Sequence, residues 1–155
     1  AMLFANIASS FGVSSEAKAL YPFLVDPFGA TDSQIGAFID SVYNNLFNRG
    51  SDAAGLAYWT GQTKQTLQAG QFVGSVLVDI MSGAQDTAAG KDITTLMGKV
   101  AVSLAYVHEQ DDRHTAWTGG SDLTAATNLM HAVTGDPLSV LTGVKSAELL
   151  IAAHA

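Results

Sequence analysis

The sequence predicts an all-α fold, a single compact bundle of about six to seven short helices. Apolar residues recur three and four positions apart along most of the chain, which is the period of a helix that buries one face. Capping residues, prolines and glycines divide the chain into segments of helical length. The Asn-Gly and Asp-Gly pairs that often join two strands of a hairpin are absent from the sequence.

Length and composition predict one globular domain over residues 1–155. Of the 155 residues 48% are apolar and only 14% are charged, enough apolar content for a core. Apolar runs are far shorter than the roughly 18–20 residues that cross a bilayer, so no membrane span is expected. The start, Ala1-Met2, resembles an expression remnant, and no signal peptide is visible after it. We therefore expect a fragment of a larger exported protein.

The charges and the lack of cysteine exclude several classes of function. Seven Lys and Arg residues are scattered singly in a chain of net charge −7, so no basic stripe is available for nucleic acid. The same balance disfavours an anionic membrane surface. Without cysteine there is no disulfide scaffold, thiolate metal site or cysteine nucleophile.

The first helices are marked by caps. Ser14 or Ser15 caps a short helix, and Pro22 is expected to kink or end it. Asp26-Pro27 and Gly29 predict a turn. Thr31 begins the next helix, with Gln34 completing a capping box. The apolar residues of that helix form one wide face: positions 35, 38, 39, 42, 43, 46 and 47.

The middle of the chain predicts two further helices. Gly50 suits a left-handed position after the helix that ends near Asn48. Asp52 caps the next helix, and Gly70 ends it. The segment 70–83 predicts an amphipathic helix with these residues inward: Phe72, Val73, Val76, Leu77, Ile80 and Met81.

The last part predicts three helices. A polar connection over 83–92 leads to a helix over 93–110, whose inward residues are expected to be Ile93, Leu96, Met97, Val100, Leu104 and Val107. A loop follows, then a helix that Ser121 or Asp122 caps. Thr134-Gly135 breaks it, and Pro137 opens the last helix from its favoured first position.

The stretch FIDSVYNNLFNRGSDAAGLAYWTGQ resembles the core of a helical bacterial family, domain of unknown function 4214. The family pattern N-R-x-x-D-x-x-G-L-x-Y-W follows a helix ending in LY or LF. Ser51 stands where the family usually has proline. The resemblance extends over residues 17–147. The matching residues are Asn48, Arg49, Asp52, Gly55, Leu56, Tyr58 and Trp59.

The resemblance implies a setting more than an activity. Such domains occur in exported bacterial proteins, beside haemolysin-type calcium repeats and in S-layer-like and adhesin-like proteins, which implies type I secretion and a secreted or cell-surface location. They also resemble, distantly, the linker domains of phycobilisomes, which are assembly modules. No catalytic residue belongs to the family pattern, so we expect no enzyme.

Most of the motif has a structural interpretation. Asp52 would satisfy free N–H groups at a helix start. Arg49 would pair with Asp52 or cap the preceding helix. Gly55 would let two helices approach, while Tyr58 and Trp59 would fill the core. Contact with a ligand is the alternative for this loop.

No cofactor or metal is expected. His108, His114, His131 and His154 lack metal-ligand spacing, and the haem reading that His108 and His131 allow is not favoured. Asp111 and Asp112, beside Glu109, form the densest acidic cluster, and Asp86 with Asp92 is a second. Neither has the loop pattern of a calcium site, so solvated helix ends are expected.

Two functions from different classes remain open. The first is a non-catalytic attachment or assembly module that contacts other domains or copies of an exported protein. The alternative is a glycan-binding module, in which Trp117, Tyr21 or Tyr58 stacks on a sugar beside Asp or Asn side chains. A surface apolar patch would favour assembly, whereas a cleft holding an exposed aromatic residue would favour glycan binding.

Overall fold

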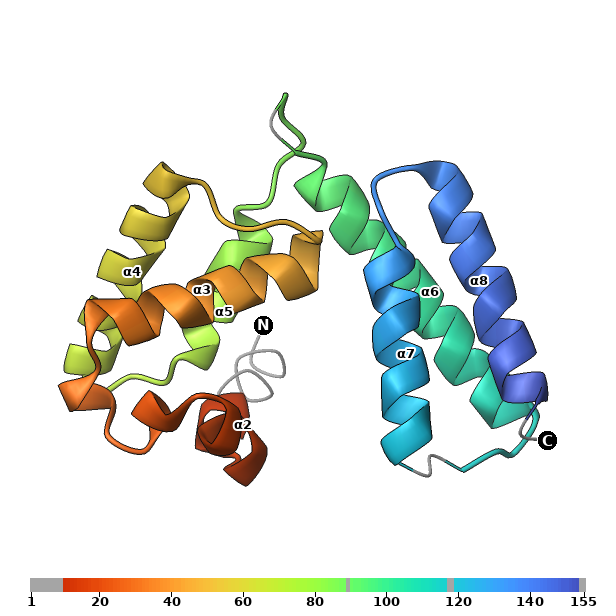
Figure 1. Ribbon diagram of the computed structural model, residues 1–155, viewed down its shortest axis with the longest axis horizontal. Helices are drawn as coiled ribbons and strands as arrows, with labels where there is room; N and C mark the ends of the chain where they lie inside the picture. Colours follow the sequence, from red (N-terminus) through yellow and green to blue (C-terminus); the bar gives the residue numbers. More distant parts are fainter. Residues whose placement is uncertain (1–9, 89, 117–118, 154–155) are drawn as a thin grey trace. The chain divides into compact units, whose positions relative to one another are not determined.

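The computed structural model describes residues 10–88, 90–116 and 119–153 and confirms the all-α prediction (Figure 1). Within them no strand is present, and one isolated bridge joins Asp86 to Lys91. None of the helices in these ranges is long and apolar enough to span a membrane. The elements are α2 (Ser15–Leu20), the 3-10 turns η1 (Pro22–Leu24) and η2 (Pro27–Gly29), α3 (Asp32–Phe47), α4 (Ala53–Gln68), α5 (Gly74–Ser82), α6 (Asp92–Asp112), α7 (Gly120–Ala132) and α8 (Pro137–Ala152).

The contacts within the chain form two compact units. The first unit comprises Ala1–Asn45 and Arg49–Ala84, and the second comprises Leu46–Asn48 and Gln85–Ala155. A compact group of contacts is not by itself a domain, because a domain has its own core and could fold alone. The single domain over residues 1–155 therefore stays a prediction.

Local capping sets the helix starts of the first unit as the sequence predicts. The Ser14 hydroxyl accepts a hydrogen bond from the Ala17 amide at 3.0 Å, and α2 ends before Pro22. In the capping box, the Thr31 amide donates to Gln34 Oε1 at 2.9 Å and the Gln34 amide donates to Thr31 Oγ1 at 3.3 Å. These bonds satisfy backbone donors that a helix start leaves without partners.

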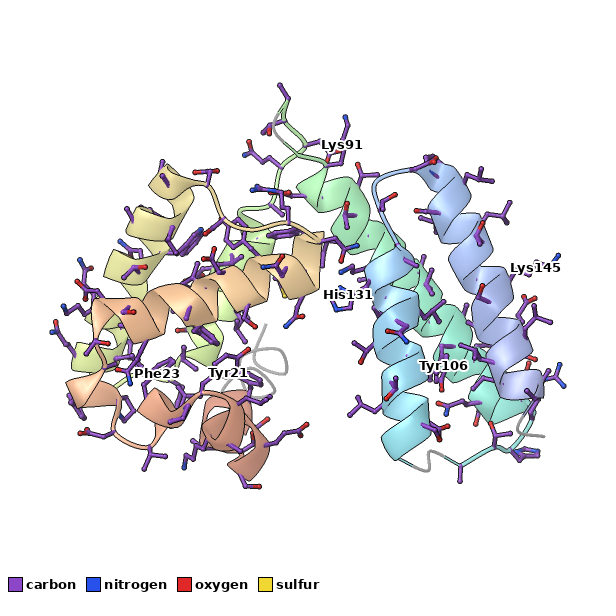
Figure 2. The ribbon with its side chains drawn as sticks, in the orientation of Figure 1. Tyr21, Phe23, Lys91, Tyr106, His131 and Lys145 are labelled. Atoms are coloured by element: carbon purple, nitrogen blue, oxygen red, sulfur yellow. The ribbon has the colours of Figure 1, made fainter. Side chains whose placement is uncertain are left out.

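The first unit has an aromatic core beneath α3. The Phe38 ring is buried, and the rings of Tyr21 and Phe23, both labelled in Figure 2, pack edge-to-face with it at centroid distances of 4.9 and 5.8 Å. Edge-to-face pairs stabilise a core beyond the area that they bury. The buried face of α3 in this unit matches the predicted one: Ile35, Phe38, Ile39, Val42 and Tyr43.

α4 ends before Gly70, as the sequence predicts. The next helix, α5, buries fewer of its apolar residues than expected. Gly70 adopts a left-handed backbone with φ 70°, and the Gln71 amide donates to the Thr66 carbonyl, which closes a Schellman motif. Phe72 and Met81 were expected inward, yet they are exposed, because the short α5 stripe is completed by Val73, Val76 and Ile80.

In the second unit, α6, α7 and α8 enclose one hydrophobic cluster (Figure 1). Its buried members are Val102, Tyr106, Leu129, Val133, Ala147 and Ile151. α6 and α8 approach closely at two glycines. A Cβ on Gly98 would lie 2.8 Å from Val140 Cγ2, and one on Gly143 would lie 2.8 Å from Val102 Cγ2.

The predicted inward face of α6 is wrong. Ile93, Met97, Val100, Leu104 and Val107 are exposed and Leu96 is half-buried. The buried side of α6 consists instead of Asp92, Thr95, Gly98, Lys99, Val102 and Tyr106. The physical reason is the close approach of α8, which leaves room only for small side chains along much of the interface.

The ends of the last three helices are only partly as predicted. α6 runs two residues beyond its expected end, to Asp112, and His114 follows with φ 53°. The Ser121 or Asp122 cap is wrong, since α7 begins at Gly120 after Gly119, without a side-chain cap. Asp136 caps α8, accepting from the Leu138 amide at 3.0 Å, and Pro137 takes the first helical position.

Candidate functional site

The family motif converges on Tyr43, a buried residue of α3. The Trp59 indole N–H donates to the Tyr43 hydroxyl at 3.0 Å. The Arg49 guanidinium carbon lies 5.2 Å from the centre of the Tyr43 ring, within the range of a cation–π contact. The sequence pattern predicted Tyr43 only as one residue of an apolar helix face. Its hydroxyl, which needs a partner when buried, was the signal that it organises the motif.

Asp52 and Gly55 have the structural roles that the sequence predicts. The Asp52 carboxylate accepts from the Gly55 amide at 2.8 Å and caps α4. A Cβ on Gly55 would lie 3.3 Å from the Tyr43 hydroxyl, so the glycine lets α3 and α4 approach. Arg49 also donates to the Gly50 carbonyl at 3.0 Å.

The two aromatic residues of the motif lie further outside the core than predicted. Tyr58 is 58% exposed, so the prediction that it fills the core is wrong. Trp59 is half-buried. The inward face of α4 is formed by Thr63 and Leu67, and Tyr58 lies off that face; its ring packs edge-on against Trp59 at 4.9 Å.

Asn48, not Gly50, adopts the left-handed backbone after α3, with φ 57°. Asparagine tolerates this conformation better than most residues. Its side-chain amide donates to the His131 carbonyl at 3.0 Å and to the Val133 carbonyl, which lies at the end of α7. A glycine at this position would supply the backbone but none of these bonds.

Lys99 is a buried cation beside Asn48. The Lys99 ammonium donates to Asn48 Oδ1 at 2.6 Å, and Lys99 is only 7% exposed. Burial lowers the pKa of Lys99 from 10.5 to about 8, because desolvation disfavours the charged form. The pair lies inside the second unit, so we assign it to stability and not to a site.

An open groove of about 690 Å³ runs between α3 and α4 in the first unit. At one end Lys64 pairs with Asp32 at 2.6 Å, and at the other Asp40 accepts hydrogen bonds from the Ser51 amide and hydroxyl. Its described lining contains no aromatic residue. The described lining is Asp32, Ser33, Gly36, Ala37, Asp40, Leu56, Ala57, Thr60, Gly61 and Lys64.

The acidic residues do not form a metal site in the described part of the chain. Asp111 and Asp112 are exposed, and Asp112 pairs with His108 at 3.2 Å. Asp86 accepts from the Thr94 amide at 3.1 Å and from its hydroxyl, bonds that lower the pKa of Asp86. Over residues 10–88, 90–116 and 119–153, no three His, Cys, Asp or Glu side chains gather as metal ligands would.

Of the aromatic residues proposed for sugar contact, the structure describes Tyr21 and Tyr58. The Tyr21 hydroxyl is hydrogen-bonded to Ser41 at 2.7 Å and its ring packs on Phe38, so Tyr21 serves the core. Trp117 and His154 lie outside the described residues. Tyr58 is therefore the exposed aromatic candidate that the structure places.

A row of exposed apolar side chains in the second unit forms the α6 outer face, defined as Ile93, Met97, Val100, Leu104 and Val107. These side chains are 45, 60, 41, 66 and 60% exposed in that order. Their spacing of four, three, four and three residues places them in one row along α6. The sequence pattern predicted that these five residues would face the core.

The comparisons place the first part of the chain in a family. Residues 8–73 match the family model "Domain of unknown function (DUF4214)". No curated protein and no solved structure matches the chain. Beyond residue 73 the family resemblance stays a prediction. The segment 8–73, which carries the Tyr43-centred motif, is thus a member of the DUF4214 family.

Proposed function

We propose that the chain is a non-catalytic attachment or assembly module of a secreted or cell-surface bacterial protein. Its partners are other domains or copies of that protein. The location rests on the family match and on the setting that the resemblance implies.

The α6 outer face carries the proposal. Five large apolar side chains in one row, each at least 41% exposed, are costly in water and typical of a surface that a protein partner covers. The row is carried by a 21-residue helix that is anchored to α8 on its opposite side. A rigid apolar row suits assembly, because little freedom is lost when a partner binds.

The groove between α3 and α4 offers no comparable support for catalysis. Its two carboxylates are engaged: Asp32 with Lys64, and Asp40 with Ser51. Hydrogen bonds from Thr94 lower the pKa of Asp86, and burial lowers the pKa of Lys99 and raises that of Tyr106. None of these three residues lines the groove.

Sedimentation velocity over a concentration series tests the proposed function. We expect the mean molar mass to rise above 16.1 kDa with concentration, and added salt to leave the rise in place because the face is uncharged. A chain that remains a monomer throughout would count against self-assembly through this face.

Glycan binding is the second candidate, and the exposure of Tyr58 favours it. A ring that is 58% exposed and held edge-on against Trp59 offers one face to a sugar. A glycan array with and without calcium tests this function. Loss of a signal in Tyr58→Ala, with Phe72→Ala as a control of similar exposure at 53%, would support it; an empty array would remove it.

A further inference from the structure

We propose that the α6 outer face binds the same face of a second copy, with the two α6 helices antiparallel and Val100 at the centre. This inference rests on the proposed assembly function and names its partner. It starts from a row of side chains that the fold leaves uncovered in the second unit.

The spacing of the row fits a helix as partner. Steps of four and three residues repeat every seven, which keeps an apolar seam aligned with a neighbouring helix. From Ile93 to Val107 the row covers about 21 Å. A copy of α6 presents a seam of identical length and spacing.

The absence of charge on the row points to a second copy. Between Ile93 and Val107 the sequence has one charged residue, Lys99, and it is buried on the opposite side of α6. Two copies of a chain with net charge −7 repel one another over most surfaces. An uncharged row is where they can approach without bringing like charges together.

The charged ends of the row determine the direction. Asp111 continues the spacing four residues after Val107, and the exposed Lys91 lies just before α6 (Figure 2). A parallel pair would bring Asp111 next to its own equivalent. An antiparallel pair separates these carboxylates by about 33 Å along the helix, well beyond the screening length of about 8 Å. It also brings Asp111 near the second copy's Lys91.

The seam residues disfavour a parallel pair as well. Parallel two-stranded coils prefer β-branched residues at the first apolar position of the heptad and leucine at the second. In α6 the first apolar position of each heptad holds Met97 or Leu104. The second position holds the β-branched residues Ile93, Val100 and Val107. This is the reverse of the arrangement that parallel pairs prefer. Since one row is smaller than the roughly 800 Å² that each partner of a standard interface buries, the pair is expected to be weak.

The first experiment compares two matched variants by sedimentation velocity, up to about 1 mM, where weak pairs form. Leu104→Glu places a charge in the row and should return the chain to 16.1 kDa. Leu141→Glu on α8 is the control, because Leu141 is 67% exposed and Leu104 is 66% exposed. It should leave association unchanged, and circular dichroism should show both variants folded.

The second experiment uses the lack of native cysteine to read direction. Under mild oxidation Val100→Cys should form a covalent dimer. Ile93→Cys alone should not, because the two sulfurs of an antiparallel pair lie about 21 Å apart. A mixture of Ile93→Cys and Val107→Cys should give the mixed dimer. A dimer of Ile93→Cys alone would indicate a parallel pair and overturn the proposal.

The outcomes separate the inference from the proposed function. If the chain associates but Leu104→Glu associates equally well, the α6 pairing is wrong while assembly remains. A monomer at every concentration contradicts the pairing and self-assembly, but not attachment to other domains of the parent protein. A monomer in which Leu104→Cys resists maleimide shows that another part of the same chain covers the face, which also overturns the pairing.

Discussion

At the scale of single residues, polar side chains hold the connection between α3 and α4. Asn48 turns the chain with φ 57°, Asp40 accepts from Ser51, and Asp52 caps α4. Each of these side chains replaces hydrogen bonds that helix ends lose. Gly50, between them, has no positive φ.

Replacing Asp52 with alanine should lower the free energy of unfolding by about 1–2 kcal/mol, because the Gly55 amide loses its acceptor. Urea unfolding measures the change. Asp52→Asn keeps an acceptor oxygen and should lose much less. Equal losses in the two variants would show that the carboxylate charge, and not the cap, is what stabilises.

Lys99 should make stability depend on pH in the alkaline range. The pKa of Lys99 is about 8 in the folded chain, below its ordinary value of 10.5. Between these two pH values the unfolded chain therefore binds more protons than the folded chain. The free energy of unfolding should therefore rise as pH increases from 8 to about 10. Above about 10 the raised pKa of Tyr106 acts in the opposite direction, because the unfolded tyrosine ionises first.

Chemical denaturation at pH 7, 8, 9 and 10 measures this dependence, which should be positive in the parent chain. Lys99→Met removes the titrating group and keeps an unbranched stem of similar length. Its stability should be flat over the same range. A rise that survives in Lys99→Met would assign the effect to another group.

At the scale of elements, α6 shows what the sequence can and cannot predict. Capping boxes, prolines and Gly70 act within a few residues, so the boundaries of α2, α3 and α4 could be predicted closely. The buried face of α6 depends on α8, whose contacting residues Val140 and Gly143 lie 42 and 41 positions after Gly98 and Val102. The row with more large apolar residues is the exposed one, and Gly98 and Thr95 face the core.

The candidate site was predictable to a similar extent. The cap at Asp52 follows from local chemistry, and the structure confirms it. The exposure of Tyr58 and the hydrogen bond between Trp59 and Tyr43 depend on how α3 packs on α4. Those are contacts between residues sixteen positions apart, which periodicity alone does not specify.

Glycine-to-alanine substitutions in two helices should have opposite signs. Gly143→Ala should destabilise by about 1–3 kcal/mol, since its Cβ would lie 2.8 Å from the stiff, fully buried Val102. Gly61→Ala, with no atom within 4 Å of its Cβ, should stabilise α4 by about 0.5–1 kcal/mol. Thermal melts followed by circular dichroism measure both. Stabilisation by Gly143→Ala would mean that α6 and α8 are not in close contact.

At the scale of the whole molecule, the boundary between the two units falls within α3. α3 runs from Asp32 to Phe47, and its last residues, Leu46 and Phe47, belong with Asn48 to the second unit. Unfolding of the second unit would release these residues and fray α3. Because α3 contributes residues to both units, we predict that the two units unfold together.

The chain should therefore unfold in one transition. Trp59 reports on the first unit when Trp117→Phe removes the other tryptophan, while far-ultraviolet circular dichroism reports on both units. Urea curves from the two signals should coincide, as two-state unfolding requires. Separate midpoints would show that the units are independent domains.

The hydrogen bond between Asp86 and the start of α6 affects how the chain folds during synthesis. Asp86 binds the Thr94 amide, and the Thr87 amide binds the Gly90 carbonyl, so the start of α6 is stabilised by residues that precede it. Closing so short a segment costs little chain entropy. As the polypeptide leaves the ribosome, Asp86 is available to accept from the Thr94 amide before α7 and α8 have been translated. The helix is then a template on which these later helices can pack.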